Sequence, residues 1–399
     1  MTAAPAAKVG DPVDAIDTPA LVIDLDAMER NLDAMAAFAR AHGMRLRPHA
    51  KTHKCARIAK LQMRAGAVGV CVQKVGEAEA LADAGVTDLY ISNEVIAVSK
   101  LARLAGLAGR VKLAVAVDSS LGIERLAAAL RASGTNVDVF VEIDVGQGRC
   151  GVAPTAAGAL AHQVVSHGLR FAGLQAYQGR AQHLRSVAER EAAIRHAVTS
   201  VRAAQASITS AGMLCPLVTG AGSGSFPFEA ASGVYGELQC GSYLFMDRDY
   251  AGNAGMVRAT PGRSEGSDFP SEGDTASVRG LAFPGPKFEH ALFVKSQVMS
   301  LGTSHAVVDA GHKSHAIDSG LPQVWQRDLV FSNGGDEHGI LMAHAPVGAL
   351  PHLGETVWLV PGHCDPTVNL HDHYIALRGG LAHGVVEAVW PIDARGRLT

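Results

Sequence analysis

Short apolar runs alternate with longer, alanine-rich amphipathic segments from about residue 20 to about residue 250. The first amphipathic segment carries Met28, Leu32 and Met35 at helical spacing, which predicts that one face of a helix is buried. Asp26 precedes these positions and Glu29 follows it three residues later. That pair predicts a capping box at the start of the helix.

Eight apolar runs between these segments are candidate strands. They cover residues 45–48, 68–72, 89–92, 112–117, 137–143, 169–175, 216–219 and 236–239. Strands that alternate with helices are typical of a parallel sheet, and eight such units predict a TIM (β/α)8 barrel in an α/β chain. An open, doubly wound sheet is the alternative, because periodicity does not separate the two folds.

The pattern changes after the eighth strand. Residues 251–287 are rich in Gly, Ser and Pro and are expected to form an irregular connection. The segments 291–300, 305–310, 355–361 and 383–392 then resemble strands separated by turns. We therefore expect a barrel over residues 25–270 and a mostly β C-terminal domain over residues 271–399, joined by residues 1–24.

Composition narrows the classes of function. The 399 residues are 48% hydrophobic, carry a formal net charge of −3 and include only 5% aromatics, which argues against nucleic acid or an anionic membrane as a partner. Six scattered cysteines without a C-x-x-C pair favour a reduced, intracellular protein. No apolar stretch approaches the roughly 18 residues of a membrane span, and no signal segment is visible, so a cytoplasmic location is expected.

The segment RPHAKTHK, residues 47–54, places Lys51 just after the first predicted strand, between His49 and His53. The carboxyl ends of barrel strands point into the active site. A lysine near other cationic groups is expected to have a lowered pKa and to act as a Schiff-base nucleophile. The alternative is a basic turn whose side chains are solvated.

Two glycine-containing loops follow the seventh and eighth predicted strands. They are GAGSGS, residues 220–225, and the segment that begins at Cys240. Glycines let backbone N–H groups approach a phosphate, and these two loops form the recurrent phosphate site of TIM barrels. The pattern is not G-x-G-x-x-G, so it does not indicate a dinucleotide. An ordinary turn is the alternative.

The segment PGHCDPTVNLHDHY places His363 and Asp365 two residues apart. An extended backbone would direct both side chains to one face, as two ligands of one metal ion require. An imidazole and a carboxylate suit a harder divalent cation such as Mn²⁺, and few protein ligands leave room for water or substrate. The alternative is a polar loop with a His–Asp hydrogen bond.

Further polar residues follow predicted strands, namely Gln73, Arg149 and Tyr177, and His183 comes soon after Tyr177. An arginine in such a loop can pair with an anionic group of a ligand. Each residue alone has an ordinary structural explanation. The residues that fall just after predicted strands together predict one rim of a barrel: Lys51, Gln73, Arg149, Tyr177, Ser223 and Ser242.

The chain resembles a known family through eight separated motifs in order. These are RPHAKTHK, VQKVGEAEAL, ISNEV, EIDVGQGRCG, LQAYQG, SGVYGELQCGSY, DEHG and GHCDPTVNLHD. They are similar to motifs of the D-threonine aldolases and equally of the 3-hydroxy-D-aspartate aldolases, from about Asp17 to the end of the chain. That family resembles the alanine racemases in fold, with a barrel that binds pyridoxal 5′-phosphate and a C-terminal β domain.

The resemblance implies a role for each motif residue. Lys51 would carry the cofactor as a Schiff base, and His183 would handle the proton of the substrate's β-hydroxyl. The implied cofactor-binding residues are Lys51, Gln73, Arg149, Tyr177, Ser223, Gly241, Ser242 and Tyr250, and the implied metal ligands are His363 and Asp365. Ser223 stands where the family usually carries threonine, which keeps the hydroxyl donor. A homodimer is also implied.

The expected function is therefore cleavage of D-β-hydroxy-α-amino acids to glycine and an aldehyde, dependent on pyridoxal phosphate and a divalent metal. Mn²⁺ is the expected ion, with Mg²⁺, Co²⁺ and Zn²⁺ as alternatives. A D-serine or D-3-hydroxyaspartate dehydratase is the nearest rival, although its His-x-Cys pattern is replaced here by His363-x-Asp365. A racemase would not need the metal pair, and a non-catalytic cofactor carrier would lack the C-terminal domain.

Overall fold

The structure is a computed structural model that describes residues 4–256, 283–343 and 349–399. In these ranges one sheet contains eight parallel strands in the order β2-β9-β8-β7-β6-β5-β4-β3. The strands are β2 (Arg45–Leu46), β3 (Val70–Val72), β4 (Asp88–Glu94), β5 (Lys112–Val117), β6 (Asp138–Glu142), β7 (Arg170–Ala176), β8 (Val218–Gly220) and β9 (Glu237–Leu238). A parallel bridge between His49 and Cys71 joins the two ends of this sheet. The predicted TIM-like barrel is therefore confirmed, and the open-sheet alternative is wrong.

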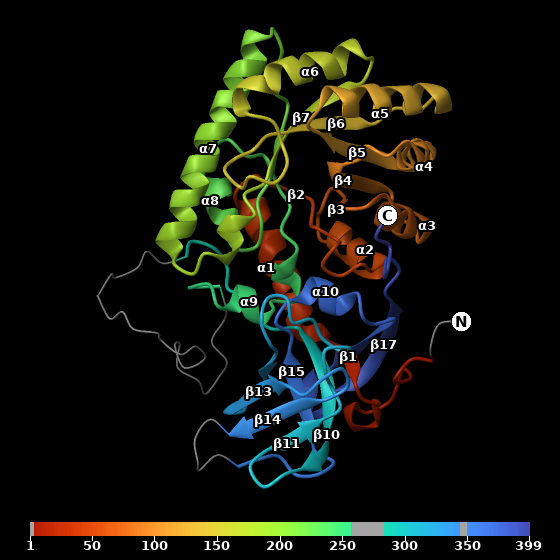
Figure 1. Ribbon diagram of the computed structural model, residues 1–399, viewed down its shortest axis with the longest axis vertical. Coiled ribbons are helices and arrows are strands. Elements are labelled where there is room, and N and C mark those ends of the chain that lie inside the picture. The colour runs from red at the N-terminus through yellow and green to blue at the C-terminus, as the bar shows by residue number, and fades with distance from the viewer. Residues whose placement is uncertain (1–3, 257–282, 344–348) are drawn as a thin grey trace.

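Helices surround the barrel and cover its strands (Figure 1). They are α1 (Leu25–Ala41), α2 (Ala56–Arg64), α3 (Val75–Asp83), α4 (Val98–Ala108), α5 (Ser120–Ser133), α6 (Ala157–Ser166), α7 (Val187–Ser210), α8 (Phe226–Ala231) and α9 (Arg248–Ala251). Among the described residues, none of the helices combines the length and the hydropathy that crossing a membrane requires.

The start of α1 differs from the prediction. Met28, Leu32 and Met35 are buried, as their spacing predicts. The capping side chain, however, is Asp24, whose Oδ1 accepts a hydrogen bond from the Ala27 backbone N–H at 3.1 Å. Asp26 instead accepts from the backbone N–H of Gly379 at 2.9 Å. The predicted capping box was wrong because a distant segment binds the carboxylate that local spacing had assigned to the helix.

The C-terminal part from residue 283 is mostly β, as predicted, and forms a second sheet below the barrel (Figure 1). Its elements are β10 (Leu292–Leu301), β11 (Ala306–Val308), β12 (Gln323–Val324), β13 (Leu329–Asn333), β14 (Gly339–Ala343), β15 (Thr356–Val360), α10 (Cys364–Val368), β16 (His373–Arg378), α11 (Gly380–His383) and β17 (Val385–Pro391). Of these strands, β12, β13, β14 and β16 were not predicted.

One strand from the start of the chain belongs to this second sheet. Strand β1 (Ala20–Asp24) pairs antiparallel with β10 and parallel with β16. The chain then runs directly from β1 into α1, and the side chains of both contribute to one hydrophobic core that also includes β10. The expected domain boundary at residues 270 and 271 lies outside the described residues.

Candidate active site

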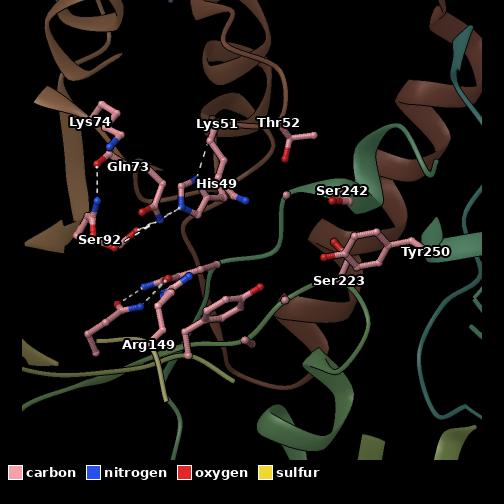
Figure 2. A pocket seen from close by; sticks show the side chains of 17 residues that line it. His49, Lys51, Thr52, Gln73, Lys74, Ser92, Arg149, Ser223, Ser242 and Tyr250 are labelled. Atoms are coloured by element: carbon pink, nitrogen blue, oxygen red, sulfur yellow. Dashed lines mark hydrogen bonds between the residues drawn. The ribbon is translucent and has the colours of Figure 1, made fainter. Parts of the chain in front are cut away.

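A cavity of about 320 Å³ opens at the carboxyl ends of the barrel strands. Eight of the predicted site residues contribute to its wall: Lys51, Gln73, Arg149, Tyr177, Ser223, Gly241, Ser242 and Tyr250. Figure 2 shows Ser223, Ser242 and Tyr250 together on one side of the cavity, away from Gln73. The structure thus brings together side chains from loops that follow six different strands.

Lys51 lies in the turn after β2, and its Nζ is 2.9 Å from Oδ2 of Asp365 in the C-terminal part. The negative charge of Asp365 raises the pKa of Lys51 although burial opposes this. The lowered pKa expected from neighbouring cations is therefore wrong for this state. The neighbouring histidines do not carry the expected charge, because burial lowers the pKa of His53 to about 4 and that of His49 well below its usual range.

His49 organises one wall of the cavity. Its Nε2 lies 2.9 Å from Nε2 of Gln73 and 3.3 Å from Oγ of Ser92. Because His49 is neutral, its ring nitrogen can accept the amide hydrogen of Gln73. His49 therefore fixes the orientation of a predicted ring-binding residue, and Ser92 is a lining residue that the sequence reading missed.

Arg149 and Tyr177 come from the loops after β6 and β7. The guanidinium carbon of Arg149 lies 5.6 Å from the ring centroid of Tyr177, which is a cation–π contact. Arg149 Nη2 also lies 3.8 Å from Oε1 of Glu142 at the end of β6. These contacts hold the guanidinium group of Arg149 at the cavity wall, where it can bind an anionic or electron-rich ring.

The phosphate-binding candidates lie where the barrel pattern predicts them, in the loops after β8 and β9. A Cβ atom at Gly241 would lie 2.6 Å from Oγ1 of Thr52 and 3.0 Å from the His49 carbonyl oxygen, so this position has room only for glycine. Thr52 Oγ1 is buried without a hydrogen-bond partner among the described residues. A hydroxyl that lacks a partner beside such a glycine fits a ligand oxygen. Ser223 Oγ accepts a hydrogen bond from the Tyr243 backbone N–H at 2.8 Å.

The His363–Asp365 segment is not extended as predicted, because helix α10 begins at Cys364. The two side chains still converge: His363 Nε2 lies 3.9 Å from Oδ1 of Asp365. His363 is the extended residue that precedes the helix, and Asp365 lies in the first turn. Cys364 between them is fully buried.

The convergence of His363 and Asp365 fits a cation. Oδ1 of Asp365 is buried and has no hydrogen-bond partner in the described part of the chain. His363 Nδ1 lies 2.7 Å from Oδ2 of Asp318, which leaves Nε2 directed to Asp365. This carboxylate–histidine arrangement is typical of metal sites. Within the described ranges no group of three or more His, Cys, Asp and Glu side chains is placed to hold a metal, so two protein ligands are the available set.

The metal motif is anchored to the barrel by Asp247. This buried carboxylate accepts hydrogen bonds from the backbone N–H groups of Tyr250 and Cys364, at 3.0 and 2.9 Å. Burial raises the pKa of Asp247 to about 6. The loop after β9 and the C-terminal motif are therefore held in one arrangement. The sequence reading missed Asp247 because its partner is distant in the chain.

His183 lies at the edge of the site and not in the cavity wall. Its Nδ1 is 2.6 Å from Oδ2 of Asp249, and its ring centroid is 5.9 Å from that of Tyr250. The His183 side chain is 53% exposed. With Nδ1 donating to Asp249, Nε2 is free to accept a proton from a molecule that enters the site.

Comparison with known proteins defines the family. The model for the alanine racemase N-terminal domain matches residues 23–249, and the model for a putative serine dehydratase domain matches residues 291–377. The chain is 42% identical over 397 residues to D-threonine aldolase of Arthrobacter sp., covering 98% of this chain and 96% of the relative. It is 42% identical over 388 residues to 3-hydroxy-D-aspartate aldolase of Paracoccus denitrificans (strain Pd 1222), covering 96% and 93%.

Solved structures give the same grouping. The crystal structure of D-threonine aldolase from Filomicrobium marinum superposes with a TM-score of 0.89 at 46% identity and covers 100% of both chains. The D-threo-3-hydroxyaspartate dehydratase from Delftia sp. HT23 is more distant, with a TM-score of 0.79 at 27% identity over 96% of this chain and 98% of that chain. The chain is an aldolase that belongs to the D-threonine aldolase and 3-hydroxy-D-aspartate aldolase family, on the alanine racemase-like fold.

Proposed function

We propose that this aldolase cleaves D-β-hydroxy-α-amino acids, of the D-threonine or 3-hydroxy-D-aspartate type, to glycine and an aldehyde with pyridoxal phosphate and a divalent metal. The observation that carries the proposal is the 2.9 Å contact between Lys51 Nζ and Asp365 Oδ2. It places the candidate cofactor lysine, from the barrel, next to the candidate metal motif, from the C-terminal part. The proposed cleavage uses both functions at one substrate.

In this proposal Lys51 holds the cofactor covalently, and Arg149 with Tyr177 and Gln73 lines its ring. Ser223, Gly241 and Ser242 hold the phosphate, and Tyr250 completes that pocket. The Gly241 position supports this, because any side chain there would fill the space beside Thr52. When bound, pyridoxal phosphate supplies an electron sink for the carbon left by Cα–Cβ cleavage, and the metal supplies a positive charge that acidifies the β-hydroxyl.

His183 is the proposed base for the β-hydroxyl proton. Its hydrogen bond to Asp249 fixes the ring so that Nε2 carries the free lone pair. Arg185 Nη2 donates to Asp249 Oδ1 at 2.6 Å, which keeps that carboxylate in place. Burial opposes ionisation of Asp249, but the hydrogen bonds from His183 and Arg185 lower its pKa below the ordinary value. The Asp249 carboxylate is therefore arranged to stabilise the positive charge that His183 would carry after it takes up the proton.

His363 and Asp365 are the proposed metal ligands, and Mn²⁺ is the proposed ion because one imidazole and carboxylate oxygens suit a harder cation. The dehydratase alternative would use a cysteine in this motif. Cys364 is fully buried, and the position two residues after His363, where the dehydratase pattern carries its cysteine, is Asp365. This supports cleavage over dehydration.

The test is a product assay on D-threonine, 3-hydroxy-D-aspartate and D-serine, with L-threonine as the stereochemical control. We expect glycine and an aldehyde from the first two substrates, and faster cleavage of D-threonine than of L-threonine. Release of ammonia and a keto acid instead would favour the dehydratase. Faster cleavage of L-threonine would overturn the proposed selectivity. The homodimer and the cytoplasmic location stay predictions of the sequence.

A further inference from the structure

Two carboxyl side chains meet behind Arg149, at the ends of strands that are separated by β5. Glu94 is the last residue of β4 and Glu142 is the last residue of β6. Glu142 is 4% exposed, and both carboxylate oxygens of Glu94 are buried; among the described residues no nitrogen or hydroxyl group donates to them, and the weak thiol donor of Cys150 faces Glu94. A buried carboxylate that lacks donors is costly, so the pair requires an explanation.

A proton shared by the two carboxylates would supply the missing hydrogen-bond donor. Burial, followed by the charge and hydrogen-bonding contact of Glu94, raises the pKa of Glu142 to about 9. A neutral Glu142 can donate to Glu94, whereas two adjacent ionised carboxylates repel each other. The groups that face the pair are Arg149, 3.8 Å from Glu142, the negatively charged Asp118, and the neutral Tyr90 and Cys150, whose pKa values burial raises.

The pair thus carries one negative charge next to one guanidinium. Arg149 is held between Glu142 on one side and the ring of Tyr177 on the other, and 45% of its side chain remains exposed towards the cavity. We propose that Glu94 and Glu142 share one proton at neutral pH and act together as a single counter-charge that positions Arg149 at the cofactor ring. The role at the ring rests on the proposed function, whereas the shared proton does not.

Glutamine variants distinguish a pair that shares one proton from a pair in which both carboxylates are ionised. In Glu94→Gln or Glu142→Gln, the new amide donates to the remaining carboxylate, so the net charge of the pair is unchanged. In the double variant that charge is lost. We expect each single variant to bind pyridoxal phosphate within about threefold of the wild-type apoprotein, and the double variant to bind about tenfold more weakly or worse, since the counter-charge that lies 3.8 Å from Arg149 is removed. Glu124→Gln, at an exposed position of α5, is the matched control.

Infrared difference spectra test the proton without the cofactor. At neutral pH the difference between the spectra of the wild-type apoprotein and each single variant should show the C=O stretch of a neutral carboxylic acid that the variant has lost. Glu229, whose pKa burial raises to about 8, contributes the same band to every protein, so it cancels in the difference. Absence of the difference band for either single variant overturns the shared proton. A stepwise loss of cofactor affinity in the singles does the same. If the band behaves as expected but the double variant binds the cofactor like the wild type, the positioning of Arg149 is overturned. If the double variant does not fold, the band in the wild type and the singles still decides the proton.

Discussion

The ammonium nitrogen of Lys51 lies 2.9 Å from Oδ2 of Asp365, across the junction between the barrel and the C-terminal sheet. In this state the lysine is an ammonium ion paired with a carboxylate, and it must lose a proton before it can attack a carbonyl carbon. The two halves of the candidate site are therefore electrostatically dependent on each other.

Lys51→Ala should abolish covalent attachment of pyridoxal phosphate, because no other amine is expected to react at this position. Borohydride reduction followed by peptide mass spectrometry checks the result. Lys74→Ala is the control, since Lys74 also contributes to the cavity wall. Labelling of Lys74 in the wild-type protein would contradict the assignment.

Gly241→Ala should weaken cofactor binding about tenfold or more, because the added methyl group would lie 2.6 Å from Thr52 Oγ1 and would displace the loop that faces the phosphate. Equilibrium binding of pyridoxal phosphate to the apoprotein measures this. Gly106→Ala is a matched control, because nothing lies within 4 Å of a Cβ atom there. Equal affinities for the two variants would place the phosphate elsewhere.

Asp365→Ala should reduce turnover by about 100-fold or more by removing one of two proposed metal ligands, while the absorbance of the bound cofactor persists. Asp318→Ala, which only orients His363, should have a smaller effect. Turnover before and after EDTA treatment and Mn²⁺ addition is the measurement, and the exposed Asp328→Ala is the control. Undiminished turnover by protein shown to be metal-free would rule out a catalytic metal.

His183→Ala should lower kcat by about 10²- to 10⁴-fold, the range expected for the loss of a general base. Asp249→Asn should have a smaller effect on kcat, because it disturbs the orientation of the ring and not its presence. Cofactor affinity should change little in either variant. Steady-state kinetics with D-threonine separate the two effects, and a change confined to KM would argue against a role in proton transfer.

The free energy of unfolding should fall as the pH rises, because the buried carboxyl group of Glu229 is more stable in its protonated form. Burial raises the pKa of this carboxyl to about 8 from an ordinary value of 4.5. The folded state therefore keeps a proton that the unfolded state releases. The stabilisation from this proton is complete below about pH 4.5, the ordinary pKa of a glutamate. It is lost between about pH 4.5 and 8, by up to about 1.4 kcal/mol per pH unit. Glu229→Gln should flatten this part of the curve in denaturant unfolding, and an unchanged slope would contradict the assignment.

The barrel could be predicted from the sequence because its strands and helices follow one another in order, so local periodicity carries the information. The strand ends then placed Lys51, Arg149 and Gly241 at one rim without knowledge of tertiary contacts. Strands β13 and β14 escaped prediction because only part of each is buried, so their apolar pattern is weaker. Strand β12 has only two residues, and β16 was missed although its four central residues are buried.

Contacts between distant segments could not be predicted. Asp24 and Asp26 are equally plausible caps in the sequence, and only the binding of Asp26 to Gly379 decides between them. The pKa direction of Lys51 depends on Asp365 in the same way. Neither the His183–Asp249 pair nor the Glu94–Glu142 pair has a signal in local spacing, since each joins two segments that are distant in the chain.

The position of β1 between β10 and β16 bears on how the protein forms during synthesis. Residues 20–24 leave the ribosome first, but residues 292–301 and 373–378, with which they pair, leave it near the end. The barrel strands can associate while translation continues, whereas β1 must wait with its backbone unpaired. The second sheet, and with it helix α10 that carries Asp365, can form only after nearly the whole polypeptide has been made. Truncated nascent chains are therefore expected to expose β1 and to be substrates for chaperones.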